Sequence, residues 1–305
     1  MFDNCAVMVI RADKNEDSVC RLEMDATTQQ ELCSCFSNAH NDLLNEKSRV
    51  IFDGSYKPLI DEFLTIENFQ LSSEIMDAVR DPIGVKSFQK ENGIFPEIKA
   101  VFIGERIESN DSEKFNIAFQ RFRKEQYISP KMFNLFLDEN TFLKEKRYGI
   151  SIADSIDCFY TDNELQFVSF FFARQIFDLS GYYRSATDQE VASFVTNEKL
   201  LIEDAESFKS MANTWIRRKI AMINDSKVLE NYSASQIKSL ASKVDIKIDV
   251  ENKKIKLPDN KEDIKIILGF LDEEAYKGPF SKNTYLANSK RAINKPLDKP
   301  PLPAL

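Results

Sequence analysis

The chain has 305 residues, of which 43% are hydrophobic and 30% are charged, a composition typical of a folded globular protein and not of a disordered one. Its densest apolar run, Phe167–Ala173, is far shorter than the roughly 20 residues of a membrane-spanning helix, so we predict no such helix. The net charge of −8 means that the molecule as a whole repels nucleic acid.

The first half of the chain predicts short strands and a few helices. Alternating apolar residues on both sides of the polar segment 13–17 indicate a hairpin, and Asp25 can cap a helix that runs to Leu44. Further on we expect strands over 48–54, 99–108 and 114–125, helices over 72–81 and 129–143, and a strand pair over 158–177 that turns at 161–163.

The last third predicts mainly helices. They are expected over 196–225, 233–244, 260–275 and 281–293, with a hairpin over 245–257 that turns at Glu251–Asn252. We therefore predict an α+β fold: an N-terminal antiparallel sheet with flanking helices (1–190), a helix-rich C-terminal domain with a small hairpin (191–293), and a proline-rich tail (294–305).

Residues for catalysis are scarce. His40 is the only histidine, and helical geometry turns Cys35 about 160° away from Cys33, so that Cys33, Cys35 and His40 cannot close a zinc site from one helix. No glycine-rich phosphate loop is present. An acid-x-Lys element at Glu97–Lys99 resembles part of a metal-dependent nuclease, but the same spacing recurs elsewhere. We predict no catalytic residue, metal ligand or cofactor, and keep the nuclease as the least favoured alternative.

The only tryptophan, Trp215, is followed by three cations. On a helical wheel Trp215 falls in the apolar stripe, which predicts a core residue rather than a base-stacking one. Arg217 lies on the opposite side and Arg218 near the rim, whereas Lys219 falls inside the stripe. We expect Lys219 either to pair with a buried acid or to extend its methylenes along the core to water.

Cations gather at two other places. Arg121, Arg123 and Lys124 lie among aromatic residues, and on a strand the two arginines would share a face. From residue 276 onward six cations face one acid, which gives +5 there and −13 for the rest of the chain. The candidate DNA-binding residues are Arg121, Arg123, Lys124, Arg217, Arg218, Lys282, Lys290 and Arg291.

The segment from Phe194 onward, with its sequences "RRKIAMI" and "ILGFLDEE" and a closing segment from Tyr285 to Lys290–Arg291, resembles the bacterial family that contains the KwaB proteins of the Kiwa anti-phage defence system. The earlier "SIDCFYTDNELQFVSFFFARQIF" is similar to the central strand pair of that family, and the resemblance covers about residues 100–293. It carries no catalytic signature.

This resemblance implies a cytoplasmic protein that binds DNA and acts with the membrane protein KwaA to block phage replication. We predict a non-enzymatic subunit that binds double-stranded DNA, forms a homodimer, and is recruited to the inner membrane by this partner. A local basic surface would then have to outweigh the net charge of −8. The alternative is an interaction scaffold without DNA binding, which docks on a membrane protein through the tail 294–305.

Overall fold

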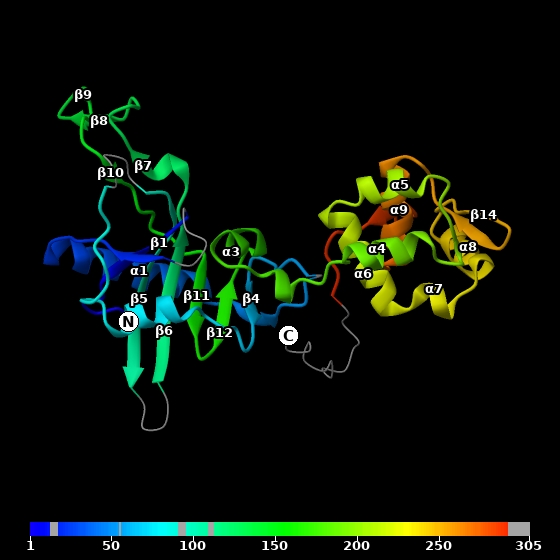
Figure 1. Ribbon diagram of the computed structural model, residues 1–305, viewed down its shortest axis with the longest axis horizontal. Coiled ribbons are helices and arrows are strands. Elements are labelled where there is room, and N and C mark those ends of the chain that lie inside the picture. Colours follow the sequence, from blue (N-terminus) through cyan, green and yellow to red (C-terminus); the bar gives the residue numbers. More distant parts are fainter. Residues whose placement is uncertain (13–17, 55, 91–95, 109–112, 292–305) are drawn as a thin grey trace. The chain divides into compact units, whose positions relative to one another are not determined.

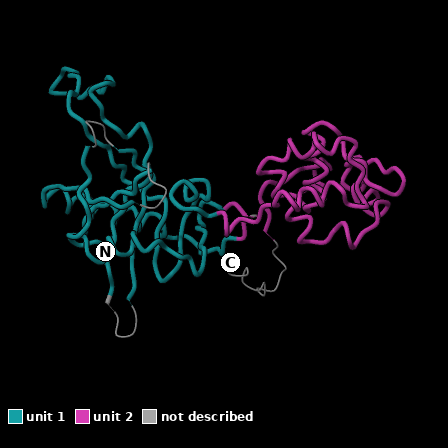
Figure 2. The backbone as a smooth tube through the Cα atoms, viewed as in Figure 1, with its two compact units in different colours: residues 1–52, 58–179 teal, residues 53–57, 180–305 magenta. Residues whose placement is uncertain are grey.

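The computed structural model describes residues 1–12, 18–54, 56–90, 96–108 and 113–291. The chain divides into two compact units (Figure 2): unit 1 comprises 1–52 and 58–179, and unit 2 comprises 53–57 and 180–305. The α+β class is confirmed, because unit 1 contains a large sheet with helices and unit 2 is rich in helices with small sheets. The predicted turn 13–17 and tail 294–305 lie outside the described residues.

An eight-stranded sheet forms the centre of unit 1, in the order β2-β1-β5-β6-β11-β12-β4-β3 (Figure 1). Every neighbouring pair is antiparallel except β3 and β4, which run parallel. The strands are β1 Val7–Arg11, β2 Val19–Arg21, β3 Ser48–Ile51, β4 Glu62–Ile66, β5 Ile98–Glu108, β6 Glu113–Arg121, β11 Cys158–Thr161 and β12 Glu164–Phe167. The predicted N-terminal hairpin is confirmed as β1–β2. The strand pair predicted over 158–177 is confirmed only up to Phe167, as β11–β12, because its continuous apolar run goes on as a helix, α3 (Phe170–Ile176).

Both faces of this sheet are covered: successive side chains of a strand point to opposite sides, yet every residue of β1 and β4 is buried. Helix α1 (Ala26–Leu44) packs over Val9 and Val101 on one face, and its N-terminus is capped by Asp25 as predicted. Helices α2 (Ser73–Arg80) and α3 (Phe170–Ile176) are the remaining helices of unit 1 outside short 3-10 turns, and both contact β5. Phe102 and Phe119 lie directly opposite each other across β5 and β6.

The helix predicted over 129–143 is wrong. The segment forms a hairpin of β8 (Leu135–Asp138) and β9 (Thr141–Lys144), which projects from the rest of unit 1 in Figure 1. Its apolar residues fit a helical period as well as a strand, but Glu139 adopts a left-handed backbone conformation (φ 50°) that ends any helix there. The short pair β7 (Tyr127–Ile128) and β10 (Gly149–Ile150) joins this hairpin to the sheet.

Unit 2 contains six helices and two small sheets in its described part. The elements are α4 Asp188–Val195, β13 Leu200–Leu201, α5 Ala205–Met211, α6 Thr214–Ser226, α7 Val228–Asn231, α8 Ala234–Lys243, β14 Asp249–Glu251, β15 Lys254–Lys256, α9 Lys261–Leu271, β16 Ala275–Lys277 and β17 Thr284–Leu286. The predicted helices 233–244 and 260–275 are confirmed as α8 and α9, and the predicted hairpin as β14–β15.

Two helices predicted in unit 2 are wrong. The single helix over 196–225 is divided into β13, α5 and α6 because two polar side chains cap new helices inside it: Asp204 accepts a hydrogen bond from the Ser207 amide at 2.9 Å, and Asn213 from the Ile216 amide at 3.1 Å. The helix over 281–293 is replaced by β17, which pairs with β16 around a tight loop in which Lys282 has a positive φ of 61°.

The core of unit 2 lies mainly between α6 and α9. Ile216, Ile220 and Ile223 of α6 are buried with Leu268 of α9 in one apolar cluster. Trp215 is half-buried and packs against this cluster, as the apolar stripe predicted. Among the described helices, none combines the length and apolar content needed to cross a membrane.

Candidate nucleic-acid-binding surfaces

Arg121 ends β6, and its guanidinium group is engaged inside unit 1. Its Nε lies 3.3 Å from Asp157 Oδ1, and its Cζ lies 3.5 Å from the centre of the Phe172 ring. Burial raises the pKa of Asp157, although the charges of Arg121 and Arg123 act in the opposite direction. Since only 18% of the Arg121 side chain is exposed, this residue orders the end of the strand more than it offers a free charge.

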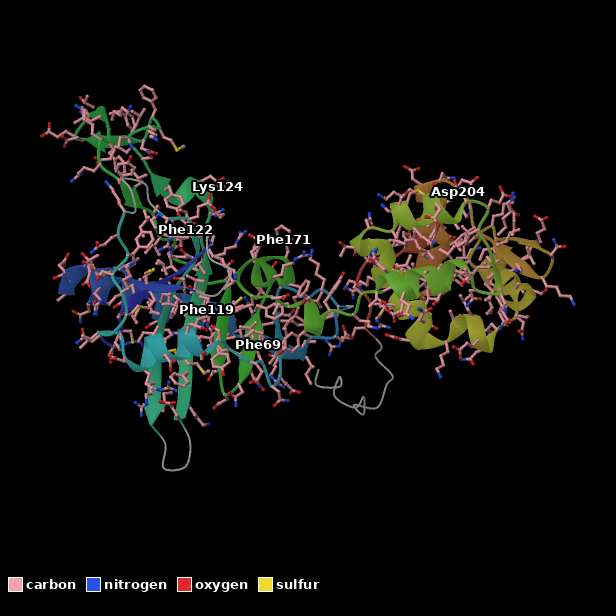
Figure 3. The ribbon with its side chains drawn as sticks, viewed as in Figure 1. Phe69, Phe119, Phe122, Lys124, Phe171 and Asp204 are labelled. Atoms are coloured by element: carbon pink, nitrogen blue, oxygen red, sulfur yellow. The ribbon has the colours of Figure 1, made fainter. Side chains whose placement is uncertain are left out.

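Arg123 and Lys124 follow at once and are exposed. The 3-10 turn η1 (Lys124–Gln126) is fixed by the buried side chain of Gln126, which accepts from the Arg123 amide at 2.9 Å and donates to the Ser151 carbonyl at 2.7 Å. Figure 3 shows Lys124 at the surface of unit 1, with Phe122 below it. The turn therefore presents two cations to solvent on an ordered backbone.

An exposed aromatic side chain lies near this end of the sheet. Phe171 is 62% exposed and contacts Phe172, the residue that supports Arg121, with 5.7 Å between the ring centres (Figure 3). Exposed cations such as those of this turn bind the phosphate backbone of nucleic acid. We name Arg123, Lys124 and Phe171 surface A.

Arg217 is predicted as outward-facing, and the structure places it between two helices. Its guanidinium donates to the Ala212 carbonyl at 3.0 Å, the Ala186 carbonyl at 3.2 Å and the Asp188 carboxylate at 2.5 Å. These bonds tie the start of α4 to α6. Its neighbour Arg218 lies over the Tyr183 ring at 4.5 Å, so both arginines contact the segment that precedes α4.

Arg184, which the sequence did not point to, also links α4 to α6, as Arg217 does. It forms ion pairs with Glu190 at 2.5 Å and with Asp225 at 3.1 Å. The hydrogen bonds that Glu190 accepts from Arg184 and Thr187 lower its pKa to about 2. Thr187 and Glu190 form a capping box, and this Thr-x-x-Glu spacing is the sequence signal that would have placed Arg184 beside the start of a helix.

Lys290 and Lys219 share one buried acid. Asp272, 7% exposed, accepts from Lys219 at 2.6 Å through one oxygen and from Lys290 at 2.8 Å through the other. Lys219 also pairs with Glu274. The prediction that Lys219 pairs with a buried acid is confirmed, and Lys290 anchors the end of the described chain rather than standing free.

Lys282 and Arg291 are exposed residues of unit 2. The Lys282 ammonium donates to the Pro279 carbonyl at 2.7 Å, a neutral partner that leaves its charge uncompensated, and Arg291 lies over the Tyr56 ring at 5.5 Å. In the same hairpin as Lys282, the paired residues Tyr276 and Tyr285 stack with ring centres 5.4 Å apart and are about half exposed. We name Lys282, Tyr276 and Tyr285 surface B; its aromatic half was missed because a helix was expected there.

The residues weighed for metal chemistry lie apart. Cys33 donates to the Cys5 carbonyl at 3.3 Å, whereas the His40 ring packs on Phe159 with centres 4.0 Å apart. Glu97 is exposed just before β5. Across the part of the chain that the structure describes, no three His, Cys, Asp or Glu side chains converge as metal ligands.

The family model described as "Kiwa protein KwaB-like" matches residues 99–280. This is more than half of the chain, and it extends from β5 to the loop after β16. The comparisons with curated proteins and with solved structures gave no match. The chain therefore belongs to the KwaB-like family and is a component of the Kiwa antiviral defence system.

Proposed function

We propose that this Kiwa component binds double-stranded DNA through exposed Lys and Arg side chains, without cleaving it. The observation that carries the proposal is that Arg123, Lys124 and Lys282 are exposed, and that their units also expose aromatic rings: Phe171 in unit 1, and Tyr276 and Tyr285 in unit 2. None of the three has an ion-pair partner among the described residues. Phosphate binding by such cations releases condensed counterions, which supplies most of the affinity of a protein for DNA.

Six of the eight candidate residues divide by their contacts into two groups, whereas Arg218 and Arg291 lie over the rings of Tyr183 and Tyr56. Arg121, Arg217 and Lys290 hold carboxylates of the protein itself and stabilise their units. Arg123 and Lys124 keep their charges available, as does Lys282. This division makes the proposal specific: substitution of the second group weakens DNA binding and leaves folding intact, whereas substitution of the first group destabilises the fold.

The test is a binding titration of duplex DNA at several salt concentrations with Mg²⁺ present, followed by inspection of the DNA. Binding that falls steeply with salt and leaves linear and circular DNA intact supports the proposal. Mg²⁺-dependent cleavage that is lost in Glu97→Gln would instead support a nuclease. Absence of binding at low salt refutes the proposal and favours the interaction scaffold.

We further propose that the protein forms a homodimer and acts with the membrane protein KwaA, which recruits it to the inner membrane to block phage replication. Membership of the Kiwa family supports a partner within that system. Deletion of 294–305 tests whether this tail binds KwaA independently of DNA binding. Loss of KwaA binding with DNA binding retained supports docking through the tail, and retention of KwaA binding excludes it.

A further inference from the structure

The β8–β9 hairpin of unit 1 exposes an unusual amount of apolar surface. Its two strands pair with each other and with no other described strand, and every residue of both strands is exposed. The large apolar side chains left in solvent, each about half exposed or more, are Phe133, Leu135, Phe136, Leu137, Phe142 and Leu143. Contiguous apolar surface of this kind marks a site of interaction.

Both faces of the hairpin are apolar. The register places Leu137 opposite Phe142 and Phe136 opposite Leu143, and because neighbouring residues of a strand point to opposite sides, one apolar pair lies on each face. A two-stranded hairpin is marginally stable in water when it stands alone. This hairpin therefore gains stability when another surface covers it, and its bare strand edges offer unpaired backbone groups for that purpose.

Charge is distributed along the hairpin with opposite signs at its two ends. The tip carries Asp138 and Glu139, whereas the base carries Lys144 and Lys146, and all four are exposed. None of these side chains forms an ion pair with any residue that the structure describes. The hairpin is thus an apolar ribbon with an acidic tip and a basic base.

We propose that this hairpin packs against the same hairpin of a second copy of the chain, in antiparallel orientation about a two-fold axis. This arrangement covers apolar surface on both copies and places the acidic tip of each hairpin against the basic base of the other, twice per dimer. The proposal deepens the homodimer of the proposed function by naming its surface, and it does not depend on DNA binding.

A lipid surface is the competing occupant, since apolar side chains and lysines together also favour membranes. The charge order counts against it. The acidic tip would enter the bilayer first, and carboxylates in the apolar region are costly. Against a second copy the same two acids meet lysines, so the observations favour self-association.

The test uses charge reversal at each end. The tip variant is Asp138→Lys/Glu139→Lys, and the base variant is Lys144→Glu/Lys146→Glu. Each variant alone sets like charges together at both ends of the dimer, so we expect its dimer dissociation constant to rise roughly tenfold or more. An equimolar mixture of the two variants restores opposite charges at both contacts, and should form a heterodimer about as tight as the wild-type dimer.

Sedimentation equilibrium of the full chain distinguishes the 35.1 kDa monomer from a dimer. The matched control is Glu31→Lys/Asp42→Lys, which makes the same charge change on the exposed side of α1 and should leave the dimer intact. Circular dichroism of every variant verifies folding. Phe136→Ser/Leu143→Ser should dissociate the dimer without a change of charge.

A wild-type chain that is monomeric at roughly 100 µM would overturn the proposal, since this concentration is well above the dissociation constant of a specific dimer. Equal loss of the dimer in the control variant, or no heterodimer in the mixture, would overturn it as well. Flotation with phosphatidylcholine–phosphatidylglycerol vesicles tests the lipid alternative. Wild-type flotation that is lost in Phe136→Ser/Leu143→Ser, with the free protein monomeric, would assign the hairpin to membranes. A dimer with the expected charge behaviour in a protein that fails to bind DNA leaves this proposal standing and refutes DNA binding alone.

Discussion

The buried ion cluster around Lys219 allows a quantitative prediction for Lys219→Met. The Lys219 side chain is 4% exposed, and its ammonium lies 2.6 Å from Asp272 and also contacts Glu274. Methionine keeps the length and the helix propensity of lysine but removes the charge. The substitution therefore leaves two carboxylates, 7% and 12% exposed, without their shared cation.

Removing one partner of a buried ion pair costs about 3–5 kcal/mol, because the remaining charge stays desolvated. Here Lys290 remains 2.8 Å from Asp272 and compensates part of the charge, so we expect the lower end, about 3 kcal/mol. With a urea m-value of about 2 kcal/mol per molar, the unfolding midpoint of unit 2 should fall by about 1.5 M.

Fluorescence of Trp215 provides the assay. It is the only tryptophan of the chain and belongs to unit 2, so its emission follows the unfolding of that unit alone. Lys209→Met is the matched control, since Lys209 forms an exposed pair with Glu206 and its loss should shift the midpoint little. A Lys219→Met midpoint within about 0.3 M of wild type, about a fifth of the expected shift, would refute the reasoning.

Three further predictions concern stability. Burial lowers the pKa of His40 from its usual 6.5, so the unfolded chain binds a proton more readily than the folded state. The free energy of unfolding of unit 1 should therefore decrease as the pH falls below about 6.5. In urea titrations His40→Phe should reduce this decrease. Hydrogen bonds from Arg184 lower the pKa of Glu190 from 4.5 to about 2. The ionised Glu190 therefore stabilises unit 2 above pH 4.5, and this stabilisation is lost as the pH falls towards 2. Glu190→Gln should abolish that loss, as measured by the fluorescence of unit 2. Asn213→Ala removes the cap of α6 and should cost about 1 kcal/mol in urea unfolding, whereas unchanged stability would mean that this cap is dispensable.

The elements that could be predicted from sequence are those in which local pattern and tertiary packing agree. Helix α9 has an asparagine cap and a regular apolar stripe, and β11–β12 has alternating residues around a turn. The single helix expected over 196–225 is wrong because the helical spacing of its apolar residues continues through the positions at which the chain leaves one element and starts the next. There, Asp204 and Asn213 compete locally for backbone amides, which a periodicity argument does not detect.

For the candidate site, the sequence identifies cations but not their partners. Arg217 falls on the outer side of its helix, yet its guanidinium group is engaged by the distant Asp188 and Ala186 carbonyl and by the nearby Ala212 carbonyl. Lys290 is likewise engaged by Asp272. Such pairings are made by the tertiary fold, so helical wheels and charge counts cannot separate a structural cation from one that is available to phosphate.

The measurement that tests the central claim most directly is the salt dependence of duplex DNA affinity for the wild type and for Arg123→Ala/Lys124→Ala/Lys282→Ala. We expect the wild type to bind, and the triple variant to fold normally but bind more weakly, with its log–log salt slope shallower by about 0.9 for each lost phosphate contact. Equal affinity and slope in the two proteins would contradict the assignment of these three cations, and no binding by either would contradict DNA binding itself.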